Sequence, residues 1–198
     1  IEEYAKMFGF DSETGIDLAG EVSGTVPNQE LKAKSNPDDP TWRIGDTYNA
    51  SIGQGYFHVT PIEMTVYSAV LANGGKIIKP HLIRDDSDNN SPVVRDLGIP
   101  QNYFQVVHEG MRMGVMEGTA TALNVWGMEV AAKTGTAEVG AAKKYVNSWV
   151  IGFWPYQNPK YAFALVMEKG PYTNLVGAPA VMRQLFDWIS VNTPEYLK

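Results

Sequence analysis

The chain has no cysteine among its 198 residues, which excludes disulfides, thiolate zinc sites and thiol nucleophiles within it. It also has no excess of positive charge. Its 16 lysines and arginines stand against 22 aspartates and glutamates, and a net charge of −6 argues against a primary nucleic-acid binder. No apolar run approaches the roughly 18–20 residues of a membrane-spanning helix. The whole chain is 44% hydrophobic and 11% aromatic, a composition typical of a folded globular protein.

The spacing of apolar residues predicts an α+β fold in which helices pack on an antiparallel sheet. Thr60, Pro61 and Glu63 form the pattern of a capping box at the start of the clearest helix. Connections between the last three strands are too short for parallel crossovers, which need about a dozen residues. The predicted helices cover 1–10, 62–73, 101–116 and 178–191, and the predicted strands cover 76–83, 129–137, 145–153 and 161–168.

Two further segments are expected to be irregular. Residues 11–57 are rich in glycine, proline, aspartate and asparagine, and residues 85–92 form a polar loop. An irregular segment as long as 11–57 is uncommon and usually has a functional role.

Four residues on the predicted strand 129–137 read Lys133-Thr134-Gly135-Thr136. Lys-Thr-Gly is one of three motifs of serine acyl-transferases that act on penicillin-like substrates. A lysine attracts an anionic substrate, and two threonine hydroxyls can donate to its carboxylate. The glycine removes a side chain that would block close approach, and the next backbone N–H can donate to a developing oxyanion. The alternative is that these residues have no catalytic role and are simply a lysine and two threonines on an exposed strand, because a given tripeptide also occurs by chance.

Further segments, in matching order, resemble the transpeptidase domain of class B (monofunctional) penicillin-binding proteins of the elongation type. The family reads T-G-I-D-L, then I-G-Q-G-Y with T-P, then A-N-G-G, then G-T-A, and W-F-x-G-x-x-P after K-T-G. The corresponding segments here are Thr14–Leu18, Ser51–Tyr56 with Thr60-Pro61, Leu71–Gly75, Gly118-Thr119-Ala120 and Trp149–Pro155, where Val150 replaces the family's phenylalanine.

This resemblance implies the penicillin-binding protein transpeptidase or serine β-lactamase-like fold and a covalent acyl transfer. A serine would attack the D-alanyl-D-alanine end of a peptidoglycan stem peptide, release D-alanine and pass the acyl group to an amine on a neighbouring strand. Lys133 would bond the serine of the family's S-x-N motif. Thr134 and Thr136 would bind the carboxylate of the substrate or of a β-lactam alongside Gly135, and the Thr136 N–H would be one oxyanion donor.

The resemblance implies no cofactor and no metal. The implied partners are the stem peptide, β-lactam antibiotics and, in the full protein, a SEDS-type glycosyltransferase, with no nucleic acid. The implied location is the bacterial inner membrane, with an N-terminal anchor and the domain on the periplasmic or extracytoplasmic side.

The family's nucleophile is not found in this chain. It lies in S-x-x-K, which precedes S-x-N and K-T-G, and no serine here has a lysine three positions later. Ser87-Asp88-Asn89 matches S-x-N in letters but follows the A-N-G-G segment, whereas the family places that motif before T-G-I-D-L. We therefore expect both motifs upstream of Ile1. We expect 1–198 to be the C-terminal part of one transpeptidase domain, with a helical and irregular part over 1–100 and the K-T-G sheet with its helices over 101–198.

Other motifs are weaker. Residues 86–90 begin like a calcium loop, but Ser91 and Leu97 stand where glycine and the bidentate glutamate belong. Gly53-Gln54-Gly55 begins like a dinucleotide fingerprint, but His58 occupies the third glycine position. The three histidines, at 58, 81 and 108, lack metal-ligand spacing.

Two functional alternatives stay open. The first is a serine β-lactamase or a β-lactam sensor domain with the same fold, which the T-G-I-D-L and I-G-Q-G-Y segments disfavour. The second is a binding or scaffolding fragment without catalysis of its own.

We predict that the 198-residue chain alone is not acylated by a fluorescent penicillin, because it lacks the S-x-x-K serine. Intact-mass spectrometry after incubation measures this directly. A covalent adduct on the isolated chain would show that the nucleophile has been misplaced.

Overall fold

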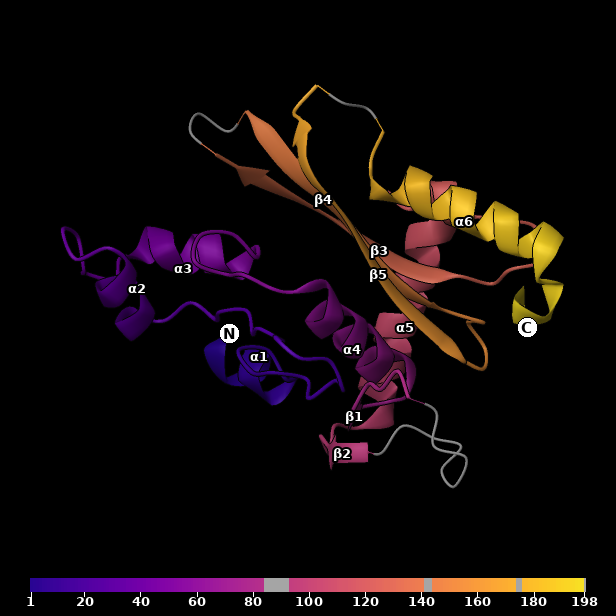
Figure 1. Cartoon of the computed structure of the whole chain (residues 1–198), viewed down its shortest axis with the longest axis horizontal. Helices are drawn as coiled ribbons and strands as arrows, with labels where there is room; N and C mark the ends of the chain where they lie inside the picture. The colour runs from indigo at the N-terminus through magenta and orange to yellow at the C-terminus, as the bar shows by residue number, and fades with distance from the viewer. Residues whose placement is uncertain (84–92, 141–143, 174–175, 198) are drawn as a thin grey trace.

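The computed structural model describes residues 1–83, 93–140, 144–173 and 176–197 (Figure 1). Its helices are α1 (Glu2–Met7), α2 (Gln29–Ser35), α3 (Ile44–Ser51), α4 (Pro61–Ala72), α5 (Gln101–Met116), the short 3-10 helix η1 (Thr121–Leu123), α6 (Ala178–Asn192) and the 3-10 helix η3 (Pro194–Leu197). Its strands are β1 (Lys76–Ile78), β2 (Val93–Asp96), β3 (Ala131–Val139), β4 (Tyr145–Trp154) and β5 (Tyr161–Pro171). None of the described helices has the length and apolar character needed to cross a membrane.

The strands form one three-stranded antiparallel sheet, in the order β3-β4-β5, and a separate antiparallel pair of β1 and β2. The α+β fold expected from the sequence is thereby confirmed, including the hairpin connections of the three-stranded sheet. The predicted helices over 62–73, 101–116 and 178–191 correspond to α4, α5 and α6.

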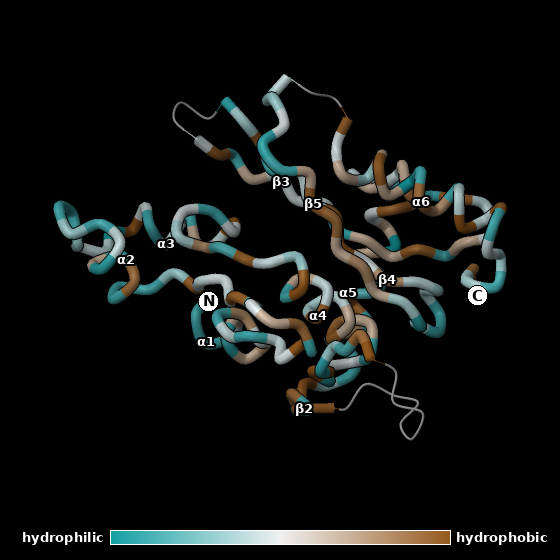
Figure 2. The backbone as a smooth tube through the Cα atoms, viewed as in Figure 1, coloured by the Kyte–Doolittle hydropathy of each residue, from teal (hydrophilic) through white to brown (hydrophobic). Residues whose placement is uncertain are grey.

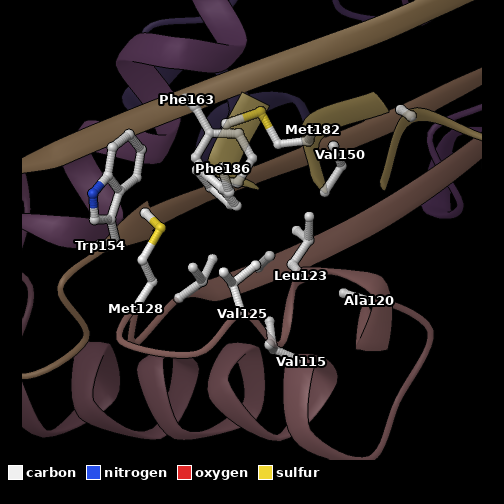
Figure 3. Packing of buried hydrophobic residues seen from close by; sticks show 13 residues of the cluster. Val115, Ala120, Leu123, Val125, Met128, Val150, Trp154, Phe163, Met182 and Phe186 are labelled. Atoms are coloured by element: carbon white, nitrogen blue, oxygen red, sulfur yellow. The ribbon is translucent and has the colours of Figure 1, made fainter. Parts of the chain in front are cut away.

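One face of the three-stranded sheet is covered by α6 (Figures 1 and 3). Trp154 of β4 and Phe163 of β5 pack there against Met182 and Phe186 of α6, with the Trp154 and Phe186 ring centroids 5.2 Å apart. Each large apolar side chain buried in this way contributes about 1.5–3 kcal/mol. This cluster therefore fixes α6 on the sheet.

The opposite face is covered by α4 and α5. Leu71 of α4, with Phe104 and Met111 of α5, packs on Ala131 and Phe153 of the sheet. Figure 2 shows the hydrophobic colour gathering where the sheet crosses these two helices. Successive strand residues alternate between the two faces of the sheet. Ala131 and every second residue of β3 after it therefore face α4 and α5, and the residues between them face α6.

The start of α4 connects two segments that are distant in the sequence. Thr60 and Glu63 form the predicted capping box: Glu63 donates its N–H to Thr60 Oγ1, and the Glu63 carboxylate accepts the Thr60 N–H at 2.7 Å. The same buried carboxylate accepts the N–H of Gly24 at 3.0 Å. Gly24 has to be glycine, because a Cβ there would lie 2.1 Å from the carbonyl oxygen of His58.

The expectation of an unbroken irregular segment over 11–57 was wrong, because α2 and α3 lie within it. Lys32 of α2 is only 4% exposed and places Nζ 2.6 Å from Oδ2 of Asp46 in α3. Both helices are short, with 7 and 8 residues, and offer too few apolar positions for a helical period to stand out. An ion pair between the two helices leaves no trace in hydropathy.

The predicted strand over 76–83 ends early, at Ile78, and pairs with β2, which the sequence did not indicate. All four residues of β2 are exposed, so its side chains show no alternation between buried and exposed positions. The polar loop over 85–92, the Ser87-Asp88-Asn89 match and the calcium-like residues 86–90 lie outside the described residues.

The pKa of Asp46 lies below its ordinary value, because its carboxylate accepts hydrogen bonds from Lys32 Nζ and the Arg43 N–H. A lowered carboxyl pKa stabilises the fold above the unfolded value of about 3.9, and this contribution is lost as the pH falls through the folded value. We therefore predict that Asp46→Asn lowers the free energy of unfolding at pH 7, and that the deficit narrows as the pH falls below about 4.

Urea denaturation of the protein that carries this chain, with and without the substitution, measures the deficit at each pH. The exposed Asp38 makes no ion pair in the described residues, so Asp38→Asn is the matched control and should change little. An Asp46→Asn deficit of constant size from pH 7 to pH 3 would contradict the role assigned to the charge.

Candidate functional site

The Lys133–Thr136 motif lies on β3, an edge strand whose described neighbour is β4 alone. The β3–β4 ladder runs without a bulge and pairs Lys133 with Ile151 and Thr136 with Ser148. The strict alternation places Lys133 and Gly135 on the α4–α5 face with Ala131, and Thr134 and Thr136 on the α6 face. The lysine and the two threonines therefore reach a ligand from opposite sides of the same strand edge.

The backbone of β3 also alternates, between groups that pair with β4 and groups that face outward. A Cβ built on Gly152 of β4 would lie 2.3 Å from the Ala131 carbonyl oxygen, so that oxygen points toward β4. The carbonyl oxygen of Val130, in contrast, accepts a hydrogen bond from Arg112 of α5 at 2.9 Å. Even-numbered residues of this stretch therefore direct their N–H and C=O groups outward, and Thr136 belongs to that set.

The end of α5 covers the beginning of this outer edge. Besides the Arg112 bond, a Cβ on Gly114 would lie 2.9 Å from the carbonyl oxygen of Ala132, so the helix approaches β3 as closely as glycine permits. A Cβ on Gly118 would in turn lie 2.9 Å from the Cα of Gly114. Beyond Ala132 the helix no longer covers the strand, and the motif begins there.

The Lys133 side chain is exposed and bends over the strand edge, where Nζ donates to the Thr134 carbonyl oxygen at 2.5 Å. The Thr134 hydroxyl lies 2.6 Å from the hydroxyl of Thr119, in the turn that follows α5. The ammonium group of Lys133, the hydroxyls of Thr119 and Thr134 and the outward N–H of Thr136 thus lie together at the uncovered part of the edge. This arrangement suits an anionic ligand that also carries a carbonyl group.

Two pockets meet at Thr136, one on each side of the strand. The α6-side pocket, about 420 Å³, is lined by Thr136, Ser148, Met167 and Tyr172 among others. The loop-side pocket, about 570 Å³, lies between β3 and the G-Q-G-Y loop and is lined on the sheet side by Gly135, Thr136 and Trp149. Its far wall is aromatic and comes from Phe10, Phe57 and Tyr67, and burial raises the pKa of the Tyr67 phenol.

The G-Q-G-Y loop is held in place by segments that precede it. Thr25 and His58 form an antiparallel bridge, and Thr25 Oγ1 donates to the Tyr56 carbonyl oxygen at 2.8 Å and contacts His58 Nδ1 at 2.9 Å. The buried Glu63 carboxylate fixes Gly24 beside this bridge. His58 lines the loop-side pocket, and its Nδ1 contact to Thr25 gives it a structural part in holding the loop.

The T-G-I-D-L segment is scaffolding in this structure. Asp17 accepts the N–H groups of Leu82 and Ile83 at 2.7 and 2.9 Å, and the bond from Ile83, followed by that from Leu82, lowers the pKa of the Asp17 carboxyl. Glu21 accepts the N–H and the hydroxyl of Thr14. The segment thus closes a loop onto the chain that follows β1.

The other candidates from the sequence lie away from the edge of β3. His108 donates through Nε2 to the Leu71 carbonyl oxygen, and its ring lies tilted against Phe153 with ring centroids 4.7 Å apart, so it packs between helix and sheet. Within the described ranges, His, Asp and Glu side chains form no group of three suited to a metal ion. Thr119 is the residue at the site for which the sequence indicated only motif order, because its contact with Thr134 depends on the turn after α5.

Known proteins share this architecture. The family model of the penicillin binding protein transpeptidase domain matches residues 1–187. The peptidoglycan D,D-transpeptidase MrdA of Salmonella typhimurium is 33% identical, over 94% of this chain and 33% of its own length. Penicillin-binding protein PBP2 of Helicobacter pylori, solved in complex with MreC, superposes with a TM-score of 0.79 at 29% identity, over 96% of this chain and 35% of that one.

A second solved structure, PBP2 of Pseudomonas aeruginosa in complex with WCK 5153, superposes with a TM-score of 0.76 at 30% identity, over 97% of this chain and 44% of that one. A Lys-Thr-Gly strand is one of the motifs of serine acyl-transferases that act on penicillin-like substrates. The chain belongs to the penicillin-binding protein transpeptidase domain family, and the relatives reported above are named MrdA or PBP2. It spans about a third of the length of the curated relatives it matches.

We predict that Gly114→Ala destabilises the protein, because its Cβ would press on the Ala132 carbonyl oxygen and force the end of α5 away from β3. The matched control is Gly110→Ala, one turn earlier in the same helix, where a Cβ meets open space. That change should instead stabilise the helix by about 0.5–1 kcal/mol. Urea denaturation of both variants decides the matter, and an equally neutral or stabilising Gly114→Ala would contradict the close approach of α5 to β3.

Proposed function

We propose that the protein carrying this chain is a peptidoglycan D,D-transpeptidase of the elongation type, which cross-links stem peptides by serine acyl transfer and is acylated by β-lactams. The observation that supports this most strongly is the uncovered part of the β3 edge. There the outward N–H of Thr136, the hydroxyls of Thr134 and Thr136 and the ammonium of Lys133 lie along a single strand.

In this proposal the strand edge receives the D-alanyl-D-alanine end of the stem peptide. The terminal carboxylate lies at the hydroxyls of Thr134 and Thr136, where an anion gains charge-assisted hydrogen bonds. The penultimate carbonyl oxygen lies at the Thr136 N–H, as one of two oxyanion donors. Gly135 leaves the strand surface low enough for the peptide to approach, because it carries no side chain at the exposed edge.

The reaction begins when the serine of an S-x-x-K motif, upstream of this chain, adds its oxygen to the penultimate D-alanine carbonyl and gives its proton to a base. The tetrahedral oxyanion collapses, the peptide C–N bond breaks, and D-alanine leaves after its nitrogen accepts a proton. An amine of a neighbouring strand then attacks the acyl-serine ester, which forms the cross-link and returns the proton to the serine. Lys133 supplies positive charge beside the carboxylate and, in this proposal, bonds the serine of S-x-N.

The proposed setting follows from the resemblance to elongation-type proteins. An N-terminal anchor in the bacterial inner membrane would hold the domain on the extracytoplasmic side, and a SEDS-type glycosyltransferase would supply the glycan strand. The relative from Helicobacter pylori is described in complex with MreC, which makes a protein of that kind a further candidate partner. The relatives named as D,D-transpeptidases favour this function over a β-lactamase or a sensor.

We predict that Lys133→Ala in the intact protein slows acylation by a fluorescent penicillin by at least about tenfold, since a charge-assisted contact is worth roughly 1.5–3 kcal/mol. The fold should persist, because the Lys133 side chain is exposed. Lys34→Ala, which removes an exposed lysine of α2, is the control for net charge. Acylation of Lys133→Ala at the parent rate, with unchanged thermal unfolding, would remove Lys133 from the mechanism.

A further inference from the structure

Thr119 has no role in the proposed reaction so far, yet its hydroxyl oxygen lies 2.6 Å from that of Thr134. At this distance one of the two hydroxyls donates its proton to the other. Each hydroxyl has a single proton, so the direction of the bond decides what Thr134 offers to a ligand. If Thr134 donates to Thr119, its lone pairs face the ligand; if it accepts, its proton is available.

An anionic ligand selects one of these two directions. A carboxylate repels the lone pairs of Thr134 and attracts its proton, so the favoured chain runs from the Thr119 O–H to Thr134 and from the Thr134 O–H to the carboxylate. Hydroxyls linked in this way polarise one another, which strengthens the final bond. The Lys133 ammonium on the Thr134 carbonyl oxygen adds positive potential at the same place.

The turn that carries Thr119 is fixed on both sides of it. Gly118 lies so close to Gly114 that no Cβ fits between them, and Ala120 is only 1% exposed and donates its N–H to the Gly114 carbonyl oxygen at 3.0 Å. Figure 3 shows Ala120 and Leu123 directed with Val115 toward the cluster under the sheet. In the G-T-A segment, Gly118 packs closely on α5 and Ala120 is buried. The backbone of Thr119 between them is therefore held in place, and its hydroxyl is directed at Thr134.

The second threonine of the motif provides a contrast. Thr136 borders both pockets, and among the described residues no side chain bonds its hydroxyl, so that O–H rotates to suit a ligand. Only Thr134 has a partner that can orient its proton before the ligand arrives.

We propose that Thr119 is a positioning residue, which donates its hydroxyl proton to Thr134 and thereby orients the Thr134 O–H toward the carboxylate of the substrate or β-lactam. This inference rests on the proposed function, in which Thr134 binds that carboxylate.

The test uses the intact protein and the second-order rate of acylation by benzylpenicillin and by its carboxylate methyl ester. Thr119→Val, which keeps the shape and removes the hydroxyl, should lower the rate with benzylpenicillin about tenfold and leave the rate with the ester nearly unchanged. Thr119→Ser restores a hydroxyl and should return the rate to near the parent value. Thr121→Val, an exposed threonine in the same turn, should have no effect.

Thr134→Val and the double variant complete the cycle. If Thr119 acts through Thr134, the double variant acylates no more slowly than Thr134→Val alone. Thermal unfolding of each variant shows that the fold persists.

The outcomes distinguish the positioning role of Thr119 from the proposed function. If Thr134→Val is acylated slowly by benzylpenicillin but Thr119→Val is acylated at the parent rate, the positioning role is overturned and the proposed function stands. Equal losses with benzylpenicillin and its ester in Thr119→Val would also overturn it, since they indicate a structural role. A Thr134→Val variant at the parent rate would overturn the carboxylate role of Thr134 itself, and the positioning role with it.

Discussion

The close packing of the last turn of α5 against the outer edge of β3 determines what this chain can do. Gly114 lets the helix reach the Ala132 carbonyl oxygen, and Arg112 occupies that of Val130, so the first part of the edge is closed to any ligand. The helix then ends, and the turn after it places Thr119 on Thr134. The uncovered part of the strand therefore begins at the Lys-Thr-Gly-Thr motif.

Some of the segments that resemble the family line the candidate site, and others hold the fold together. The motif on β3 and the G-T-A turn bring polar groups to the open edge, whereas T-G-I-D-L and the start of α4 hold distant loops together through buried or backbone-bonded carboxylates. Glu63 shows how much depends on one such group, because it caps α4 and binds Gly24, next to the Thr25–His58 bridge that supports the G-Q-G-Y loop. The G-Q-G-Y loop, held in this way, forms one wall of the loop-side pocket.

The sequence predicted what depends on local periodicity and on motif order. The α4 capping box, the bounds of α5 and the three-stranded hairpin sheet follow from caps, apolar spacing and short turns. It missed α2, α3 and β2, since the ion pair of Lys32 with Asp46 and the fully exposed strand β2 leave no hydrophobic pattern. It identified Lys133, Thr134, Gly135 and Thr136 as candidates on one strand, but it could not indicate which helices cover each face of that strand, or that Thr119 contacts Thr134, because both depend on tertiary packing.

In the proposed function, the uncovered edge of β3 receives the acyl carbonyl and the carboxylate of a substrate. A crystal structure of the intact protein acylated by a penicillin tests this most directly. We expect the acyl carbonyl oxygen about 2.7–3.1 Å from the Thr136 nitrogen and the penicillin carboxylate within hydrogen-bond distance of the Thr134 and Thr136 hydroxyls. An acyl-enzyme in which neither group contacts residues 133–136 would contradict the account.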